Sequence, residues 1–138
     1  RSVKNELVGL IQYAQQQAVT ESREYRILFD EEQKRYWAVR WVRAEEDEEM
    51  FEPVEEAWGQ ERELPHHLSF KKLPKEKDEA SKLPYLAFYP SGSSGQAEIV
   101  VEDAGGRRQG FSIETTGALG KVKVEEGGSA GHPRVHST

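Results

Sequence analysis

Residues 3–29 read VKNELVGLIQYAQQQAVTESREYRILF, and the spacing of the apolar residues changes within this stretch. In its first part they recur three or four positions apart, which is typical of a helix with one buried face. From Tyr25 to Phe29 apolar and polar residues alternate, which is typical of a strand. The stretch therefore predicts an amphipathic helix over about residues 2–22, followed by strands from about residue 24.

The apolar stripe of this helix predicts where the helix packs. Because its later positions hold small alanines, another layer can approach the helix axis closely, as happens when a helix lies along a sheet. We expect the seam between helix and sheet to consist of Leu7, Leu10, Ile11, Ala14 and Ala18.

Short strands are predicted through most of the remaining chain. Trp37, Val39 and Trp41 share one face of a second strand, and aromatic side chains in strands are usually part of the core. Further alternating runs, separated by turns, continue to about residue 125. One helix followed by about six to eight short strands predicts an α+β fold with antiparallel sheet. Residues 126–138 carry few apolar side chains, so we expect a disordered C-terminal tail there.

Residues 44–63 concentrate negative charge. Ten carboxylates are opposed by one arginine, which gives this segment a formal charge of −9. Since the whole chain carries −6, the other residues together carry +3. Burying so many unpaired carboxylates would cost far more free energy than a small domain can offset. We therefore expect an exposed acidic loop over residues 44–63.

Length and composition limit the class of protein. The 138 residues suffice for one domain, and three Trp, five Tyr and five Phe can build its core. The chain has no cysteine, which excludes disulfides, thiolate metal sites and cysteine nucleophiles. It contains no apolar run of the ~20 residues that a membrane helix needs, yet it opens at Arg1 directly in a helical pattern. We expect the helix to continue upstream of Arg1.

An enzyme or metal protein is the main alternative class. Its best evidence is His66-His67 beside the acidic segment, but adjacent histidines on a strand point to opposite sides, and no second ligand pair accompanies them. The serines of residues 91–94 lie in a turn, without the strand-to-helix elbow of a nucleophilic serine. We expect no catalytic residue, no cofactor and no metal site.

A nucleic-acid-binding protein is the second alternative. A phosphate-binding surface needs clustered Lys and Arg. The nearest candidates, Arg107-Arg108 and Lys121 with Lys123, are few and belong to an acidic chain. The charge pattern therefore disfavours nucleic acid as a partner.

Three stretches of the chain resemble one known family. The apolar helix with Ala14-Gln15 and Ala18-Val19, followed by the strand from Tyr25, is similar to the way type IV pilins leave their N-terminal helix. The turn Phe88-Tyr89-Pro90-Ser91-Gly92 and the closing pair Thr115-Thr116-Gly117 and Val122-Lys123-Val124 also resemble elements of that superfamily. In detail, residues 3–125 resemble the minor pseudopilin H family of type II secretion and its FimT-type relatives in type IV pili.

Two features depart from the family pattern. Ala118 stands where the family often has a basic residue after Thr-Gly, and the acidic segment is longer than usual. These departures indicate specialised loops.

The resemblance implies a pilin-like domain over residues 1–125 and a structural rather than catalytic role. It implies a subunit anchored in the bacterial inner membrane by the upstream helix, with this domain in the periplasm. Its partners would be other pseudopilin subunits, assembled in a filament that supports protein export, and it would have no small-molecule substrate. A minor type IV pilus subunit, including one that binds DNA, and a metal-binding or enzymatic periplasmic domain stay open as alternatives.

Apolar residues within the acidic segment predict how it would contact such partners. Apolar groups on a charged segment are either attached to their own domain or held ready for a partner. We expect Trp58 to anchor the segment on the domain, and Met50 and Phe51 to contact a neighbouring head.

Overall fold

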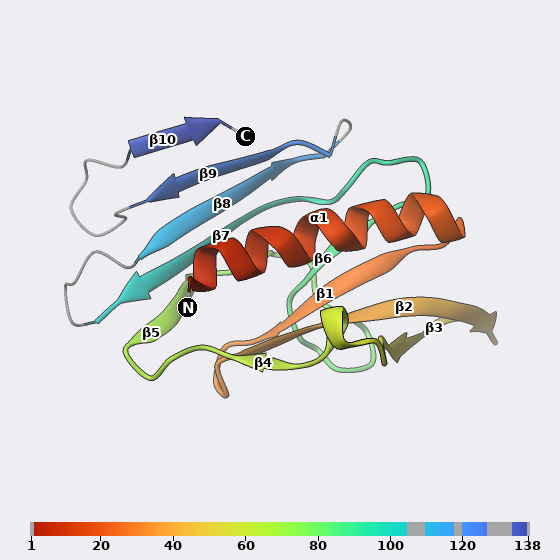
Figure 1. Cartoon of the computed structure of the whole chain (residues 1–138). Coiled ribbons are helices and arrows are strands. Elements are labelled where there is room, and N and C mark those ends of the chain that lie inside the picture. Colours follow the sequence, from red (N-terminus) through yellow and green to blue (C-terminus); the bar gives the residue numbers. More distant parts are fainter. Residues whose placement is uncertain (1, 105–109, 118–119, 127–133, 138) are drawn as a thin grey trace.

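The first element of the computed structural model is the helix α1 (Val3–Glu21), which lies across the sheets (Figure 1). Ser2 caps its start, because the Ser2 Oγ accepts a hydrogen bond from the Asn5 backbone N–H at 3.2 Å. Ser22 ends it in the left-handed conformation, with its N–H directed to the carbonyls of the last turn. The structure describes residues 2–104, 110–117, 120–126 and 134–137.

The described residues contain ten strands in two antiparallel sheets. The first sheet has the order β3-β2-β1-β6, with β4 paired to β2. Its strands are β1 (Tyr25–Asp30), β2 (Arg35–Glu45), β3 (Glu48–Pro53), β4 (Arg62–Glu63) and β6 (Tyr85–Phe88). The second sheet has the order β10-β9-β8-β7-β5. Its strands are β5 (Leu68–Lys72), β7 (Gln96–Asp103), β8 (Phe111–Thr116), β9 (Val122–Glu126) and β10 (Arg134–Ser137).

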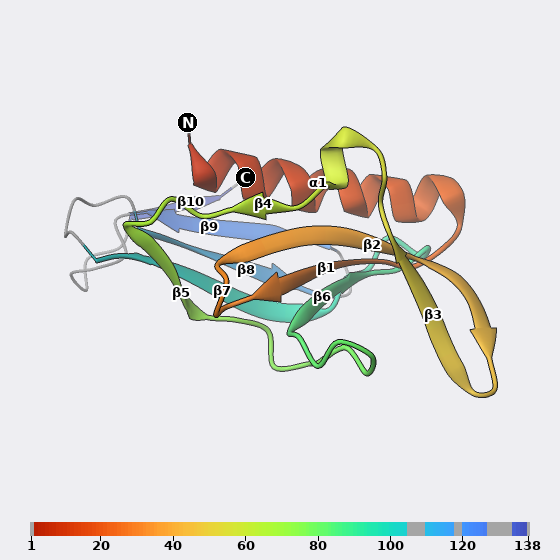
Figure 2. The ribbon, with the colours of Figure 1, turned by 90° about the horizontal axis from the view of Figure 1, so that it is seen from below.

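The helix and the two sheets form two layers. Figures 1 and 2 show α1 on one side of both sheets, so a single helix covers the sheet layer. The five seam residues are buried, with 4% of Leu10 exposed and 0% of Leu7, Ile11, Ala14 and Ala18. They share one core cluster with residues of both sheets, such as Ile27 of β1 and Ile113 of β8.

Aromatic side chains join the two sheets beneath the helix. Phe29 of β1 and Tyr36 of β2 both meet Phe70 of β5 edge to face, with ring centroids 5.6 and 6.4 Å apart. Polar contacts hold α1 on the second sheet as well. Gln15 Nε2 donates to the Gly120 carbonyl at 2.5 Å, and Lys4 forms an ion pair with Glu126 of β9. The helix is thus attached to both sheets.

The predicted α+β fold with antiparallel sheet is confirmed, but the number of strands differs. Ten strands are present where about six to eight were predicted. The additional strands include β3, β4 and β10. Their own sequences do not indicate a strand, and each is extended because it pairs with a neighbouring strand. Short or highly charged segments carry a weak strand pattern of their own, because pairing with a neighbour decides their conformation.

The prediction of an acidic loop over residues 44–63 is wrong. The end of β2 and the whole of β3 form a hairpin there, followed by the 3₁₀ turn η1 (Ala57–Gly59) and β4. The carboxylates do lie in water, as predicted. Because both faces of the hairpin are exposed, side chains that point to either face reach solvent, and a strand keeps them hydrated as well as a loop does.

The prediction of a disordered tail over residues 126–138 is wrong where the structure describes that segment. Glu126 belongs to β9, and Arg134–Ser137 forms β10, which pairs antiparallel with β9. Backbone pairing with the edge of the sheet needs no apolar side chain, so composition did not indicate it. Residues 127–133 and 138 lie outside the described residues.

Shortening the seam side chains should destabilise the fold strongly. We expect Ile11→Ala or Leu10→Ala to lower the free energy of unfolding by about 2–5 kcal/mol, because each leaves a cavity between helix and sheets. The matched control is Gln12→Ala, on the exposed side of the same helix, which should change it by less than about 0.5 kcal/mol. Urea unfolding followed by circular dichroism measures all three. Equal midpoints for the buried and exposed variants would contradict the packing described above.

Candidate functional site: the acidic hairpin

Strands β2 and β3 form a hairpin that extends beyond the rest of the first sheet (Figure 2). Every residue from Arg43 to Met50 is exposed. The turn consists of Glu46 and Asp47, with φ of 49° and 66°, which is the conformation of tight two-residue hairpin turns. We call residues 43–50 the hairpin tip. The tip lies at the same end of the molecule as the C-terminal end of α1, well below the helix in the view of Figure 2, and the N-terminus lies at the opposite end (Figure 1).

A β-bulge separates the hairpin tip from its base. Trp41 pairs with Phe51 and Arg43 with Met50, so Val42 is an extra residue on β2. A bulge increases the local twist and bends the strand. It therefore changes the direction of the ribbon where it leaves the body of the domain.

The base of the hairpin is attached to the domain through Arg26. The guanidinium carbon of Arg26 lies 3.9 Å from the ring centroid of Phe51 and 4.1 Å from that of Tyr85. Arg26 also forms ion pairs with Glu24 at 2.7 Å and with Asp78 at 3.1 Å. A half-buried cation between two rings, neutralised by carboxylates, is a favourable contact. Phe51 is consequently held on the first sheet.

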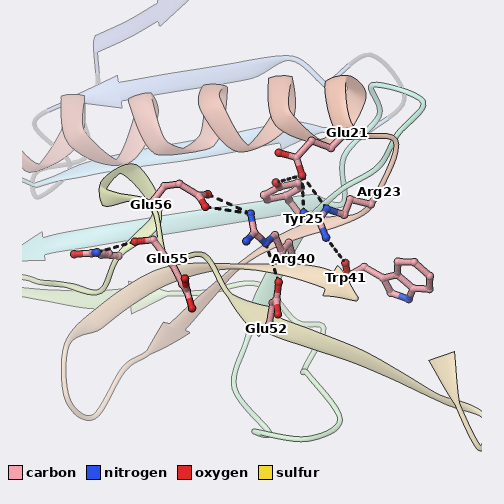
Figure 3. A network of polar contacts seen from close by, with 9 residues as sticks. Glu21, Arg23, Tyr25, Arg40, Trp41, Glu52, Glu55 and Glu56 are labelled. Atoms are coloured by element: carbon pink, nitrogen blue, oxygen red, sulfur yellow. Dashed lines mark hydrogen bonds and ion pairs between the residues drawn. The ribbon is translucent and has the colours of Figure 1, made fainter. Parts of the chain in front are cut away.

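The other face of the base carries a second polar network (Figure 3). Arg40 binds Glu52 of β3 at 3.1 Å and Glu56 at 3.2 Å. Arg23 donates a hydrogen bond to the Trp41 carbonyl at 3.2 Å. These contacts link β2, β3 and the segment after β3 to the end of α1, so the base is fixed on both faces.

Residues 54–64 return from the hairpin along the helix. Trp58 packs against Tyr13 of α1 and Tyr25 of β1 with its ring tilted to both, and the ring centroids are 4.6 and 5.8 Å away. A Cβ on Gly59 would lie 2.6 Å from Val54 Cγ1. Any other residue at position 59 would therefore displace the Val54 side chain. Trp58 anchors the acidic segment on the domain, as the sequence predicted.

The hairpin tip carries unpaired negative charge. Glu45 is paired with Arg43 at 3.2 Å, and Glu49 accepts a hydrogen bond from the Trp41 indole N–H. The carboxylates of Glu46, Asp47 and Glu48 have no ion pair or hydrogen bond among the described residues. Three solvated charges at three consecutive positions give the tip a negative potential that attracts cationic groups.

The two residues predicted to contact a partner differ in their exposure to solvent. Met50 lies in the hairpin tip opposite Arg43 and is 37% exposed. Phe51 is half-buried against Arg26. Sequence reasoning missed Arg26 and Arg40. Each is a charged residue inside a mainly apolar strand. Because burying an unpaired charge is costly, this position alone could have predicted an ion pair for each arginine.

The histidines of the alternative enzyme or metal reading lie in a turn before β5 rather than on a strand. His66 is exposed, and the His66 and His67 rings are 5.9 Å apart, edge to face. Within the part of the chain that the structure describes, no group of three or more His, Asp and Glu side chains is placed to hold a metal ion. No described helix combines the length and the apolar character that crossing a membrane requires.

Comparison with known families decides the assignment. Residues 4–117 match the model of the family described as type II transport protein GspH. The chain belongs to the GspH family. This confirms the resemblance drawn from the sequence and assigns the chain to the minor pseudopilins of type II secretion.

Solved structures of a minor pseudopilin show the same fold. Two structures of the minor pseudopilin EpsH from the type II secretion system of Vibrio cholerae match with TM-scores of 0.68 and 0.61. The first is 10% identical and covers 93% of this chain and 98% of that one. The second is 11% identical, with 89% and 92% covered. At these identities the likeness concerns the fold. No curated protein matches the chain.

The hydrogen bond between Tyr25 and Glu21 predicts how stability depends on pH. The Tyr25 hydroxyl donates to the Glu21 carboxylate at 2.7 Å. This bond is the main reason that the pKa of Glu21 lies below its ordinary 4.5. Burial, and then the same bond, raises the pKa of Tyr25 above its ordinary 10.0. The pair therefore stabilises the fold between the two ordinary pKa values.

We expect Tyr25→Phe to flatten the pH dependence at both limits. Glu21 loses its stabilising effect as pH falls through its lowered pKa, and Tyr25 loses its own as pH rises through its raised pKa. Both losses depend on the Tyr25 hydroxyl. Urea midpoints measured from acid to alkaline pH test this, with Tyr13→Phe on the exposed side of α1 as control. If Tyr25→Phe and the wild type lose stability in parallel at both limits, the bond has no such effect.

Proposed function

We propose that this chain is the periplasmic head of a minor pseudopilin, held at the inner membrane by a helical segment that continues α1 upstream. It works by assembly with other pseudopilin subunits and not by catalysis. The family match supports this proposal, because GspH proteins are transport proteins of type II secretion. The position of the hairpin tip, at the end of the molecule away from the N-terminus, leaves it accessible to neighbouring heads (Figure 1).

The acidic hairpin is the observation that carries the proposed docking role. Its base is fixed on both faces by Arg26 and Arg40, while its tip carries charge that no described residue neutralises. A charged projection on a fixed base accelerates encounter with a complementary surface and disfavours wrong partners. We infer that the tip selects which neighbouring head docks, with exposed Met50 in the contact.

The same charge argues against a DNA-binding pilus subunit. The hairpin tip, which is exposed throughout, is acidic, and the whole chain carries −6. Phosphate groups would be repelled there.

Reversing charges in the tip should weaken docking without unfolding the domain. We expect Glu46→Lys with Glu48→Lys to weaken binding to partner pseudopilin heads roughly tenfold at low salt, mainly through slower association. The difference should fade as salt rises, because exposed charges are screened. Surface plasmon resonance with the other pseudopilin heads of the same secretion system, over a range of salt, measures both rate constants.

The matched control is Glu31→Lys with Glu32→Lys. These two acids are exposed in the turn between β1 and β2, at the other end of β2, and the change in charge is the same. The control should bind like the wild type. Docking through the tip is refuted when both double variants associate at the wild-type rate in low salt.

A further inference from the structure

Strand β3 is an edge of the first sheet. It pairs with β2 on one side, and no described strand lies on its other side. An edge strand presents a row of unpaired backbone N–H and C=O groups, which can accept another extended chain.

The register identifies the backbone groups that face outward. The Val54 N–H donates to the Ala38 carbonyl, toward β2, at 3.0 Å. Successive residues of a strand direct their backbone N–H and C=O groups to alternate sides. The N–H and C=O groups of Glu52, Met50 and Glu48 therefore also face β2. Those of Glu49, Phe51 and Pro53 face away from it. Proline is tolerated at such a position, since the N–H that it lacks would have no partner in the sheet.

The tip also lacks the layers that usually stabilise a sheet. From Arg43 to Met50 it is a two-stranded ribbon with both faces exposed. Such ribbons are marginally stable alone, and a third strand is the ordinary means of stabilising them. The free edge and the exposed ribbon are independent of the charge on the tip, and both favour an added strand.

The charge then restricts which strand can be added. A second copy of this chain would bring its own Glu48, Glu49 and Glu52 alongside the same residues, and like charges on adjacent strands are destabilising. A basic strand would instead place Lys or Arg beside these carboxylates. Met50 lies between Glu48 and Glu52 on one face of β3, and Phe51 follows Glu49 on the other face, so apolar residues of the added strand would find apolar neighbours.

We propose that β3 accepts an extended basic segment of a partner pseudopilin head as an additional strand. This rests on the proposed function, because it states how the tip docks. The backbone of Glu49 and Phe51 provides the pairing, and the glutamates of β3 select the basic sequence. Binding therefore depends on the main chain as well as on side-chain charge.

Two substitutions at one position separate these contributions. Glu49→Ala removes the carboxylate and keeps the outward N–H, while Glu49→Pro removes that N–H as well. With the purified pseudopilin heads of the same secretion system as probes, we expect Glu49→Ala to weaken binding by less than about threefold. Glu49→Pro should weaken it by about tenfold or more, because pairing along the edge is interrupted.

Amide hydrogen exchange tests the wild type without any substitution. In the complex, the Glu49 and Phe51 amides should become protected. The Glu48 and Met50 amides, which face β2, should be protected in the free protein and in Glu49→Pro, which shows that the ribbon is intact in the variant.

The outcomes separate this inference from the proposed function. If a head binds, yet Glu49→Pro binds like Glu49→Ala and the outward amides exchange as freely as before, strand addition is refuted and docking by side chains stands. If the wild type binds none of the heads, both the proposed function and strand addition are overturned.

Discussion

The structure depends on one packing constraint: a single helix must bury its apolar stripe against two sheets at once. Ala14 and Ala18 are fully buried, and their small side chains let the sheet layer approach the helix backbone. Leu7 and Ile11 fill the core between them and the N-terminal turn. Because no second α-helix is present among the described residues, loss of this seam would expose the inner faces of both sheets together.

The hairpin takes its rigidity from that seam. Trp58 packs on Tyr13 of the helix, and Arg40 ties the segment that carries Trp58 to β2 and β3. The position of α1 therefore determines where the base of the hairpin lies. Beyond the bulge at Val42 these contacts end. Among the described residues, the tip is held by pairing between β2 and β3 and by the hydrogen bond from the Trp41 indole to Glu49. A fixed base with an unsupported tip suits a surface that gains stability when a partner covers it.

Sequence reasoning recovered what local periodicity encodes and missed what pairing decides. The helix and its seam follow from spacings of three and four, and β1 follows from alternation, because each pattern lies within one element. Strand β3 reads as EEMFEP, whose glutamates and Pro53 are poor strand formers, and its conformation comes from pairing with β2. The role of Arg26 in attaching the hairpin could not be predicted for a related reason. The rings that it contacts, Phe51 and Tyr85, belong to two other strands that are distant in the sequence.

The distribution of charge explains why assembly would be with other subunits rather than with copies of the same chain. Outside residues 44–63 the chain carries +3, so the repulsion between two copies is concentrated at their hairpins. Screening at physiological salt limits that repulsion to about 8 Å, so it acts between strands that lie side by side, about 5 Å apart. It is therefore strongest when two β3 edges meet directly, and weak when the hairpin meets a basic strand or lies in solvent. Charge on an edge strand thus disfavours self-pairing, and under the proposal of strand addition it leaves the backbone available to a basic partner.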